Sequence, residues 1–307
     1  MCLRLLCRVA GMTPGLAGLL IAPCVRASPL SHVSIASVHV IHRASHVSRG
    51  AAGTLVAPTA PVGAHPIAVA VDEHTRHVFV LSAGPLKNIH NRGSVSMLDA
   101  ATGMVRRTIR LGFYPQALAV DRRAARAFVV TQNSSQDGSD DDVPGTVSVL
   151  DTATGSLLRT VTVGHEPMAV AVDERTGRAF IANKLSDSVS VLDAATGTTL
   201  RTVTVGPGGS GGYAAPSAVA VDERTGHVFV LDAYDDSVRM LDATTGKVLH
   251  SSIVGTDPRT IVVDGQAGRA FVPSDGGLQV LDTHTGDVLS SSLSERSGLS
   301  VSLVLID

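Results

Sequence analysis

The sequence predicts an all-β protein, a β-propeller of four-stranded antiparallel blades. Three observations support this prediction. A segment of similar sequence recurs five times, each copy contains four strand-like stretches, and turn residues separate these stretches. A repeat of roughly 40 to 50 residues that holds four strands is typical of a propeller blade.

The first strand of each repeat is a short apolar run that ends in aspartate. These runs occupy residues 67–72, 117–121, 168–173, 218–222 and 260–264. Near-continuous apolar runs are typical of strands that are buried on both faces. We therefore expect the first strands to be the innermost ones, packed between neighbouring blades.

The other three strands of each repeat become steadily more polar. The third strand alternates apolar and polar residues, which indicates that one face is exposed, and the fourth is rich in Thr and Val. Burial should therefore fall from the axis of the ring to its rim. The second strand carries one phenylalanine in each repeat, which predicts a periodic core residue: Phe79, Phe128, Phe180, Phe229 and Phe271.

The turns between the strands share an aspartate at the start and, in most copies, a glycine at the end. Asp173 to Gly177 joins a first strand to a second, and Asp193 to Gly197 joins a third to a fourth. An aspartate can accept hydrogen bonds from nearby backbone N–H groups, and glycine adopts positive φ without strain. These aspartates are therefore expected to be structural.

The repeat resembles a known family, the YVTN β-propeller repeat. The resemblance is carried by Phe180-Ile181-Ala182-Asn183, by residues 188–197 and by Val203-Thr204-Val205-Gly206, and it spans residues 63–290 in five copies. Phenylalanine replaces the family's usual tyrosine. The resemblance implies an extracytoplasmic or cell-surface propeller, and many members of that family have no known activity.

The ends of the chain supply enough residues for one further blade. Leu299 to Asp307 resembles a first strand, whereas residues 33–41 and 54–62 resemble outer strands. We expect five explicit blades and a composite sixth closed by both termini, which would hide the edge strands. Seven blades are the alternative, although with the observed insertions they would need about 318 residues, more than the 307 of the chain.

The first 27 residues have the features of a signal peptide. Arg4 and Arg8 precede an apolar stretch, and small residues precede Ser28. This stretch is too short for a transmembrane helix. The expected domains are a signal peptide at 1–27, N-terminal strands of the closing blade at 28–62, and the propeller at 63–307. The protein is expected to be secreted, periplasmic or on the cell surface. A misassigned start is the alternative.

Composition excludes one class of partner and predicts a core without cross-links. The net charge is −2, whereas a nucleic-acid binder normally has a basic face. All three cysteines, Cys2, Cys7 and Cys24, lie in the leader, so the mature chain would contain no disulfide. A monomer is expected.

Three insertions are predicted to emerge on one face of the ring. Strands alternate in direction, so connections from strand two to three share a face with connections from strand four to the next blade. The two-to-three connections are long in repeats one and two, and residues 207–213 lengthen the connection before the fourth repeat. Insertions on one face often mark a binding face, and neutral loop drift is the alternative.

Residues beside the first-strand prolines should ring the mouth of the channel on that face. The candidate ligand-binding residues are His65, Tyr114, Gln116, Glu166, Asp257 and Arg259. Such a set could hold a small polar ligand or a cation. An ordinary solvated ring of loops is the alternative.

Asn133, Asp137 and Asp140 are candidate calcium ligands, because their spacing is similar to the start of a calcium loop. Pro144 stands where that loop has its bidentate glutamate, so a plain acidic loop is the alternative, and no other cofactor is expected. No recognisable catalytic motif occurs. We therefore predict a non-enzymatic binding or scaffold propeller that contacts an unknown protein or small polar ligand. The alternative is a lactonase-like hydrolase or lyase, which would need His65, Glu166 and Asp257 to converge.

Overall fold

A computed structural model of the chain describes residues 4–6, 39–41, 60–85, 92–133, 143–206, 214–275 and 277–293. These residues form five four-stranded antiparallel sheets, the blades. A separate two-stranded sheet pairs β1 (Arg4–Leu6) with β2 (His39–Ile41). Within the outer strand expected at residues 33–41, the described residues 39–41 therefore pair with residues 4–6 rather than with a blade.

The five blades follow one another along the chain. Blade 1 consists of β3 (Pro66–Asp72), β4 (His77–Ser82), β5 (Arg92–Asp99) and β6 (Val105–Phe113). Blade 2 consists of β7 (Pro115–Asp121), β8 (Arg126–Thr131), β9 (Pro144–Asp151) and β10 (Leu157–His165). Blade 3 consists of β11 (Pro167–Asp173), β12 (Arg178–Asn183), β13 (Ser188–Asp193) and β14 (Thr199–Thr204), with the 3₁₀ turn η2 (Lys184–Ser186) before β13.

Blade 4 consists of β15 (Pro216–Asp222), β16 (His227–Asp232), β17 (Ser237–Asp242) and β18 (Val248–Ile253). Blade 5 consists of β19 (Val262–Asp264), β20 (Arg269–Ser274), β21 (Gly277–Asp282) and β22 (Val288–Leu293). The four strands predicted in each repeat are confirmed in all five copies.

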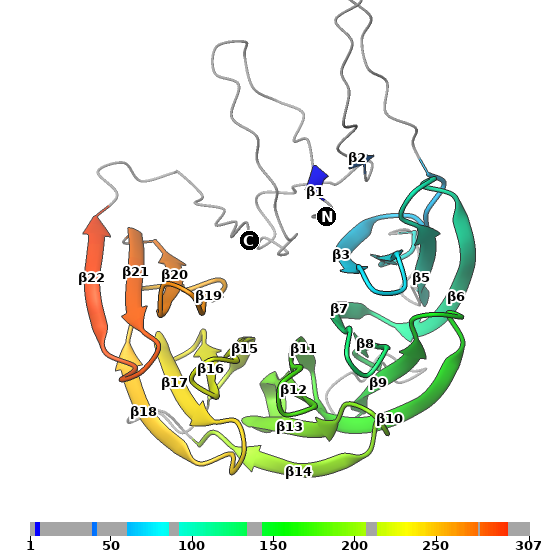
Figure 1. The fold of residues 1–307 in the computed structure, drawn as a ribbon. Helices are drawn as coiled ribbons and strands as arrows, with labels where there is room; N and C mark the ends of the chain where they lie inside the picture. Colours follow the sequence, from blue (N-terminus) through cyan, green and yellow to red (C-terminus); the bar gives the residue numbers. More distant parts are fainter. Residues whose placement is uncertain are drawn as a thin grey trace, which may run out of the picture.

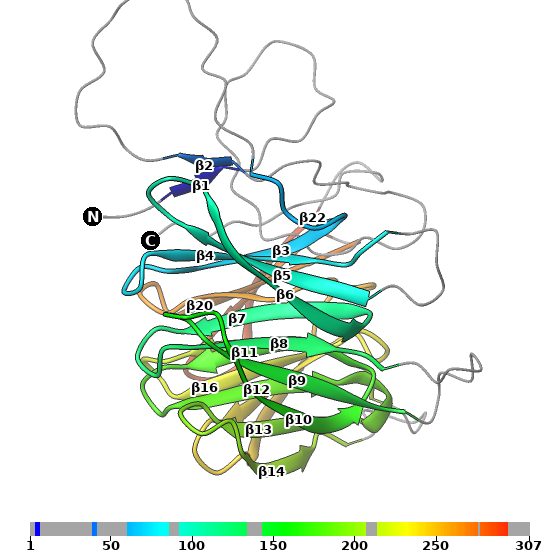
Figure 2. The ribbon, with the colours of Figure 1, turned by 90° about the vertical axis from the view of Figure 1, so that its right-hand side faces the viewer.

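The blades are arranged around a common axis, with the first strand of each blade innermost and the fourth outermost (Figure 1). Neighbouring first strands contact one another in order, from β3 to β7, β11, β15 and β19. The strands run along the axis, as the view turned by 90° shows (Figure 2). This is the arrangement of a β-propeller.

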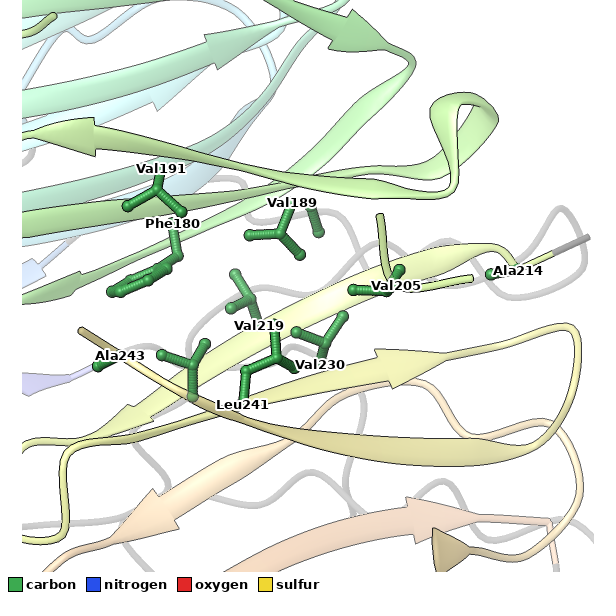
Figure 3. Packing of buried hydrophobic residues seen from close by; sticks show 11 residues of the cluster. Phe180, Val189, Val191, Val205, Ala214, Val219, Val230, Leu241 and Ala243 are labelled. Carbon is green, nitrogen blue, oxygen red and sulfur yellow. The ribbon is translucent and has the colours of Figure 1, made fainter. Parts of the chain in front are cut away.

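Each blade packs its second-strand phenylalanine against the next blade. Phe180 of blade 3 lies in one buried cluster with Val228, Val230 and Leu241 of blade 4 (Figure 3). Phe79, Phe128 and Phe229 make the same contact with the equivalent three positions of the blades that follow them. Burying a phenylalanine side chain contributes about 1.5–3 kcal/mol, so these contacts are a main source of cohesion between blades.

The order of burial within a blade differs from the prediction. The first strands β3, β7 and β11 are half-buried at most positions, and the second strands β4, β8, β12 and β16 are buried at every position but the first. The third strands β13 and β17 are also more buried than the first. A first strand has a sheet partner on one side only and borders the axis on the other. A second strand has sheet partners on both sides and blades against both faces.

The turns confirm the structural role of the aspartates. Asp72 accepts hydrogen bonds from His74 and Thr75, and Asp242 accepts hydrogen bonds from Thr244 and Thr245. The glycine at the end of the first turn has positive φ in blades 3, 4 and 5. In blades 1 and 2 the same backbone conformation is taken by Arg76 (φ 59°) and Ala125 (φ 54°).

The described sheets do not close the ring. Phe271 of blade 5 is only half-buried, whereas Phe79, Phe128, Phe180 and Phe229 are at most 2% exposed. On blade 1, the surface that would receive a preceding phenylalanine is formed by Val78, Val80 and Leu98, and Ala60 and Val62 pack against it. The composite sixth blade was predicted from residues 28–62 and 299–307, of which only the short strand β2 and residues 60–62 lie within the described residues.

Candidate functional site

The bends that lead into the first strands share an unusual backbone conformation. His65, Tyr114, Glu166 and Asp257 all have positive φ, between 47° and 52°. Non-glycine residues rarely adopt this conformation, which costs of order 1–3 kcal/mol. The candidate site therefore lies on a backbone feature that recurs in blades 1, 2, 3 and 5.

Hydrogen bonds tie these bends to the connections between the second and third strands. The N–H groups of Ala83, Gln132 and Lys184 donate to the carbonyl oxygens of His65, Tyr114 and Glu166, at 2.8 to 3.0 Å. The bends and these connections therefore share one edge of the ring. We call this edge, made of the pre-proline bends and the two-to-three connections, the loop face.

The described ends of all three long connections lie on the loop face. Two of these connections lie within a blade and begin where the second strand ends, at Ser82 and at Thr131. The third joins two blades, from the end of β14 at Thr204 to the start of β15 at Pro216. Residues 86–91, 134–142 and 207–213, which carry the insertions, lie outside the described residues. The insertions thus begin and end on the face that strand alternation predicts.

Two candidate carboxylates each form an ion pair with a cation of the same blade. The Glu166 carboxylate lies 3.1 Å from Nζ of Lys184, at the start of η2. The Asp257 carboxylate lies 2.8 Å from Nη2 of Arg259, which also lies 3.3 Å from Asp275. All these side chains are partly exposed, so each pair contributes little to stability but fixes the position of its charges.

The remaining candidates lie in blades 1 and 2. His65 precedes β3, and Gln116 donates from Nε2 to the carbonyl oxygen of Tyr114 at 3.3 Å. His65, Glu166 and Asp257 belong to blades 1, 3 and 5, so an intervening blade separates each from the next. The six candidates therefore share a face, and the three needed for an enzyme are distributed around the ring.

The candidate calcium ligands are only partly described. Asn133 donates from Nδ2 to the carbonyl oxygen of Pro144 at 2.8 Å, which holds it at the base of its connection. Asp137 and Asp140 lie outside the described residues. Within the described parts of the chain, no group of three or more His, Cys, Asp or Glu side chains is placed to hold a metal ion.

A buried charged cluster beneath the loop face was missed from the sequence. Arg239 pairs with Asp232 and Asp235, each at 2.7 Å, and Arg239 and Asp232 are at most 5% exposed. Asp187 of blade 3 lies nearby, and burial, together with the charge of Asp232, raises its pKa. The signal was a break in the repeat: position 239 is Arg where blades 1 to 3 have Ser96, Ser148 and Ser190.

Two large apolar side chains project from the loop face. Tyr234 is 64% exposed and Leu185 is 54% exposed, and both lie in two-to-three connections of neighbouring blades. Tyrosine is enriched among the residues that contribute most to protein interfaces, and Leu185 adds apolar surface beside it.

These features define a β-propeller with a loop-bearing face. Comparisons with solved structures agree on the fold. The chain is similar to the β-propeller domain of Cps50 (Swd1) from Myceliophteria thermophila, with 13% identity and a TM-score of 0.56 over 72% of this chain and 66% of that domain. It is also similar to a functionally unknown protein from Desulfotomaculum acetoxidans, with 14% identity and a TM-score of 0.58 over 76% of this chain and 70% of that one.

A third similar structure is hydrazine synthase from Kuenenia stuttgartiensis, with 11% identity and a TM-score of 0.59 over 74% of each chain. At these identities the likeness concerns the fold alone. The chain matches no known protein-family profile and no curated protein. Among the described residues, no helix has the length and apolar character to cross a membrane.

Proposed function

We propose that the chain is an exported, non-enzymatic binding propeller whose loop face contacts a protein partner. The observation that carries this proposal is the gathering of three lengthened connections, four strained bends and two exposed apolar anchors on one face. Rigid scaffolds commonly present their binding residues on such loops. Export is supported by the signal-like residues 1–27, and the YVTN-like repeat is consistent with an extracytoplasmic location.

The charge arrangement of the loop face favours binding over catalysis. Glu166 and Asp257 are each paired with a cation of the same blade, and His65 lies on a third blade. A general acid and a general base must both lie within hydrogen-bond reach of one reacting group. The hydrolase or lyase alternative would need His65, Glu166 and Asp257 to reach one reacting group from three different blades, and a small polar ligand at the channel mouth is the alternative within the binding class.

We also propose that the ring is closed by a sixth blade assembled from both ends of the chain. Two surfaces support this closure. Blade 5 presents the half-buried Phe271, and blade 1 presents Val78, Val80 and Leu98 at the positions that receive a phenylalanine elsewhere. The segment 54–62 aligns with the fourth strands of the repeat, and 299–307 aligns with the first strands.

Site-specific photocrosslinking tests the binding proposal. A photoreactive phenylalanine analogue is placed at Tyr234 or Leu185 on the loop face, and at Met104 on the opposite edge as a control. Met104 is 67% exposed, so the three sites are equally accessible. Irradiation in the native host should give one discrete protein adduct from positions 234 and 185 and none from 104. Equal adducts from both faces, or none from the loop face, would contradict the proposal.

A further inference from the structure

On the face opposite the loop face, the turns after the first strands form a second ring of residues. The residue that follows the first-strand aspartate is Glu73, Arg122, Glu174, Glu223 and Gly265 in blades 1 to 5. These residues border the axis, and successive members interact from one blade to the next. The junction between blades 4 and 5 differs from the others, and this difference points to a binding site.

Between blades 2 and 3, the residues of this second ring form a charged pair. Arg122 donates to Glu174 through its Nε at 2.8 Å, its Nη2 at 3.4 Å and its backbone N–H at 3.1 Å. This forked contact is the geometry in which arginine binds carboxylates most strongly. The Glu174 carboxylate raises the pKa of Arg122, so the guanidinium stays charged.

Between blades 3 and 4 the carboxylate has no such cation. The backbone N–H of Glu174 donates to Oε1 of Glu223 at 2.7 Å, and Nε of Arg175 donates to the carbonyl oxygen of Glu223 at 2.8 Å. Among the described residues, no cation forms an ion pair with the Glu223 carboxylate. Burial raises the pKa of Glu223, and the negative charges of Asp173 and Glu174 raise it further.

Between blades 4 and 5 the ring has a cavity. Gly265 places no side chain beside Glu223, and a cavity of about 490 Å³ opens there, with Val221 and Val263 on its apolar wall. We call it the axial pocket. Its charged lining consists of Asp222, Glu223, Asp264 and Arg224, and the Nε of Arg224 already donates to the carbonyl oxygen of Gly265 at 2.7 Å. Three carboxylates and one engaged guanidinium favour a positively charged ligand.

Asp222 gives the pocket a buried acceptor. Its side chain lines the pocket and is 1% exposed, and Oδ2 has no hydrogen-bond partner among the described residues. A Cβ at position 265 would lie 3.1 Å from Oδ1 of Asp222. Asp121 and Asp173 also have an unpartnered Oδ2, but there the next blade supplies the Glu174 or Glu223 side chain. At Asp222 the next blade supplies only glycine.

We propose that the axial pocket binds a small organic cation with a guanidinium or primary ammonium group. The cation lies beside the carboxylates of Asp222, Glu223 and Asp264, and the aliphatic part of the ligand lies against the two valines. A cavity of this volume lies in the range of small-molecule sites. The proposal is independent of the loop face, which is on the other side of the ring.

Calorimetric titration of the full chain with butylguanidinium tests the proposal, with butylurea as an uncharged control of the same shape. We expect saturable one-site binding of butylguanidinium with a Kd below about 10 mM, in the range of weak small-fragment binding, and no binding of butylurea. Glu223→Gln should weaken binding at least tenfold while keeping an acceptor for the Glu174 N–H. Asp287→Asn removes an exposed carboxylate of blade 5 that does not line the pocket and should leave binding unchanged.

A second variant supplies the cation from the chain itself. Gly265→Arg places a cationic side chain beside the carboxylates of the pocket, and the φ of Gly265 lies outside the positive range that disfavours side chains. The Asp222 carboxylate must shift slightly to admit the new Cβ. This variant should abolish butylguanidinium binding. The proposal is overturned if butylurea binds equally, if Glu223→Gln binds as well as the parent chain, or if Gly265→Arg still binds.

Discussion

The guanidinium of Arg239 lies 2.7 Å from the Asp232 carboxylate inside blade 4, and solvent reaches at most 6% of either side chain. At the same two positions of blade 3, Asn183 donates from Nδ2 to the hydroxyl of Ser190 at 2.9 Å. The repeat therefore accepts two polar pairs at one site, one charged and one neutral.

Removing one partner of the charged pair should be strongly destabilising. Asp232→Asn leaves the buried Arg239 with one of its two counter-charges, Asp235, and a broken buried pair typically costs about 3–5 kcal/mol. Urea unfolding measures this loss. The double variant Asp232→Asn with Arg239→Ser recreates the pair of blade 3 and should recover most of it. A double variant no more stable than the single one would contradict this explanation.

Relief of backbone strain should stabilise blade 2. Ala125 has a φ of 54° where blades 3, 4 and 5 have glycine, and this conformation costs an L-residue about 1–2 kcal/mol. Ala125→Gly should raise the free energy of unfolding by about 0.5–1 kcal/mol after the entropy of glycine in the unfolded chain is subtracted. Gly177→Ala, the reverse change in blade 3, should lower it. Shifts of the same sign in both variants would contradict this prediction.

Acid should weaken the fold through the turns between the third and fourth strands. The Thr245 N–H, with the Thr245 hydroxyl, lowers the pKa of Asp242, and the Thr196 N–H and hydroxyl do the same for Asp193. A folded pKa below the unfolded value of about 3.9 contributes stability above that value, and the contribution is lost as pH falls through the folded pKa. The denaturation midpoint should therefore decline below about pH 4.

Asp242→Asn separates this contribution from other titrations. The variant should be less stable than the parent chain at pH 7, and the difference should shrink at about pH 3, where the aspartate of the unfolded parent chain is largely protonated. Urea midpoints at both pH values measure the difference. A gap between variant and parent that is constant across this pH range would show that the Asp242 charge contributes nothing.

Closure of the ring predicts coupling between Phe271 and the C-terminal segment. Phe271→Ala and deletion of residues 294–307 should each destabilise the fold, because both remove one packing contact. Phe229→Ala, at a junction already described, should cost about 3–5 kcal/mol and serves as the reference. The combined variant should cost little more than either change alone. Strictly additive losses would show that the segment does not pack on Phe271.

The repeat made much of this fold predictable from sequence. Phe180 and its equivalents marked the second strands, and Asp173 and Asp193 marked the turns, because local spacing alone determines them. The relative burial of strands was not predictable in the same way. Ala169 and Ala182 are the same residue type in apolar strands, yet Ala169 is half-buried and Ala182 is fully buried. A strand beside the axis has a sheet neighbour on one side only, and this depends on how the blades meet.

The candidate sites also divide into residues that could be predicted from sequence and residues that could not. The residues of the loop face could be assigned because strand direction alternates, so Glu166 and Asp257 were placed on one face without coordinates. Arg239 was not found because it departs from the repeat at a single position. Glu223 was not found because it has the same residue type as Glu73 and Glu174, and its surroundings depend on the neighbouring blades. A comparison of the five copies position by position would have marked Arg239 and Gly265 as exceptions.

The phenylalanine contact between successive blades also bears on how such a ring can arise. The face of a blade that carries the phenylalanine fits the face of the next blade that receives it. Two copies of one duplicated gene segment can therefore pack against each other from the start. The number of units is then limited by geometry, since the turn from one blade to the next must bring the last unit back to the first. Local exceptions such as Arg239 and Gly265 can accumulate afterwards, because the shared contact keeps the units together while individual positions diverge.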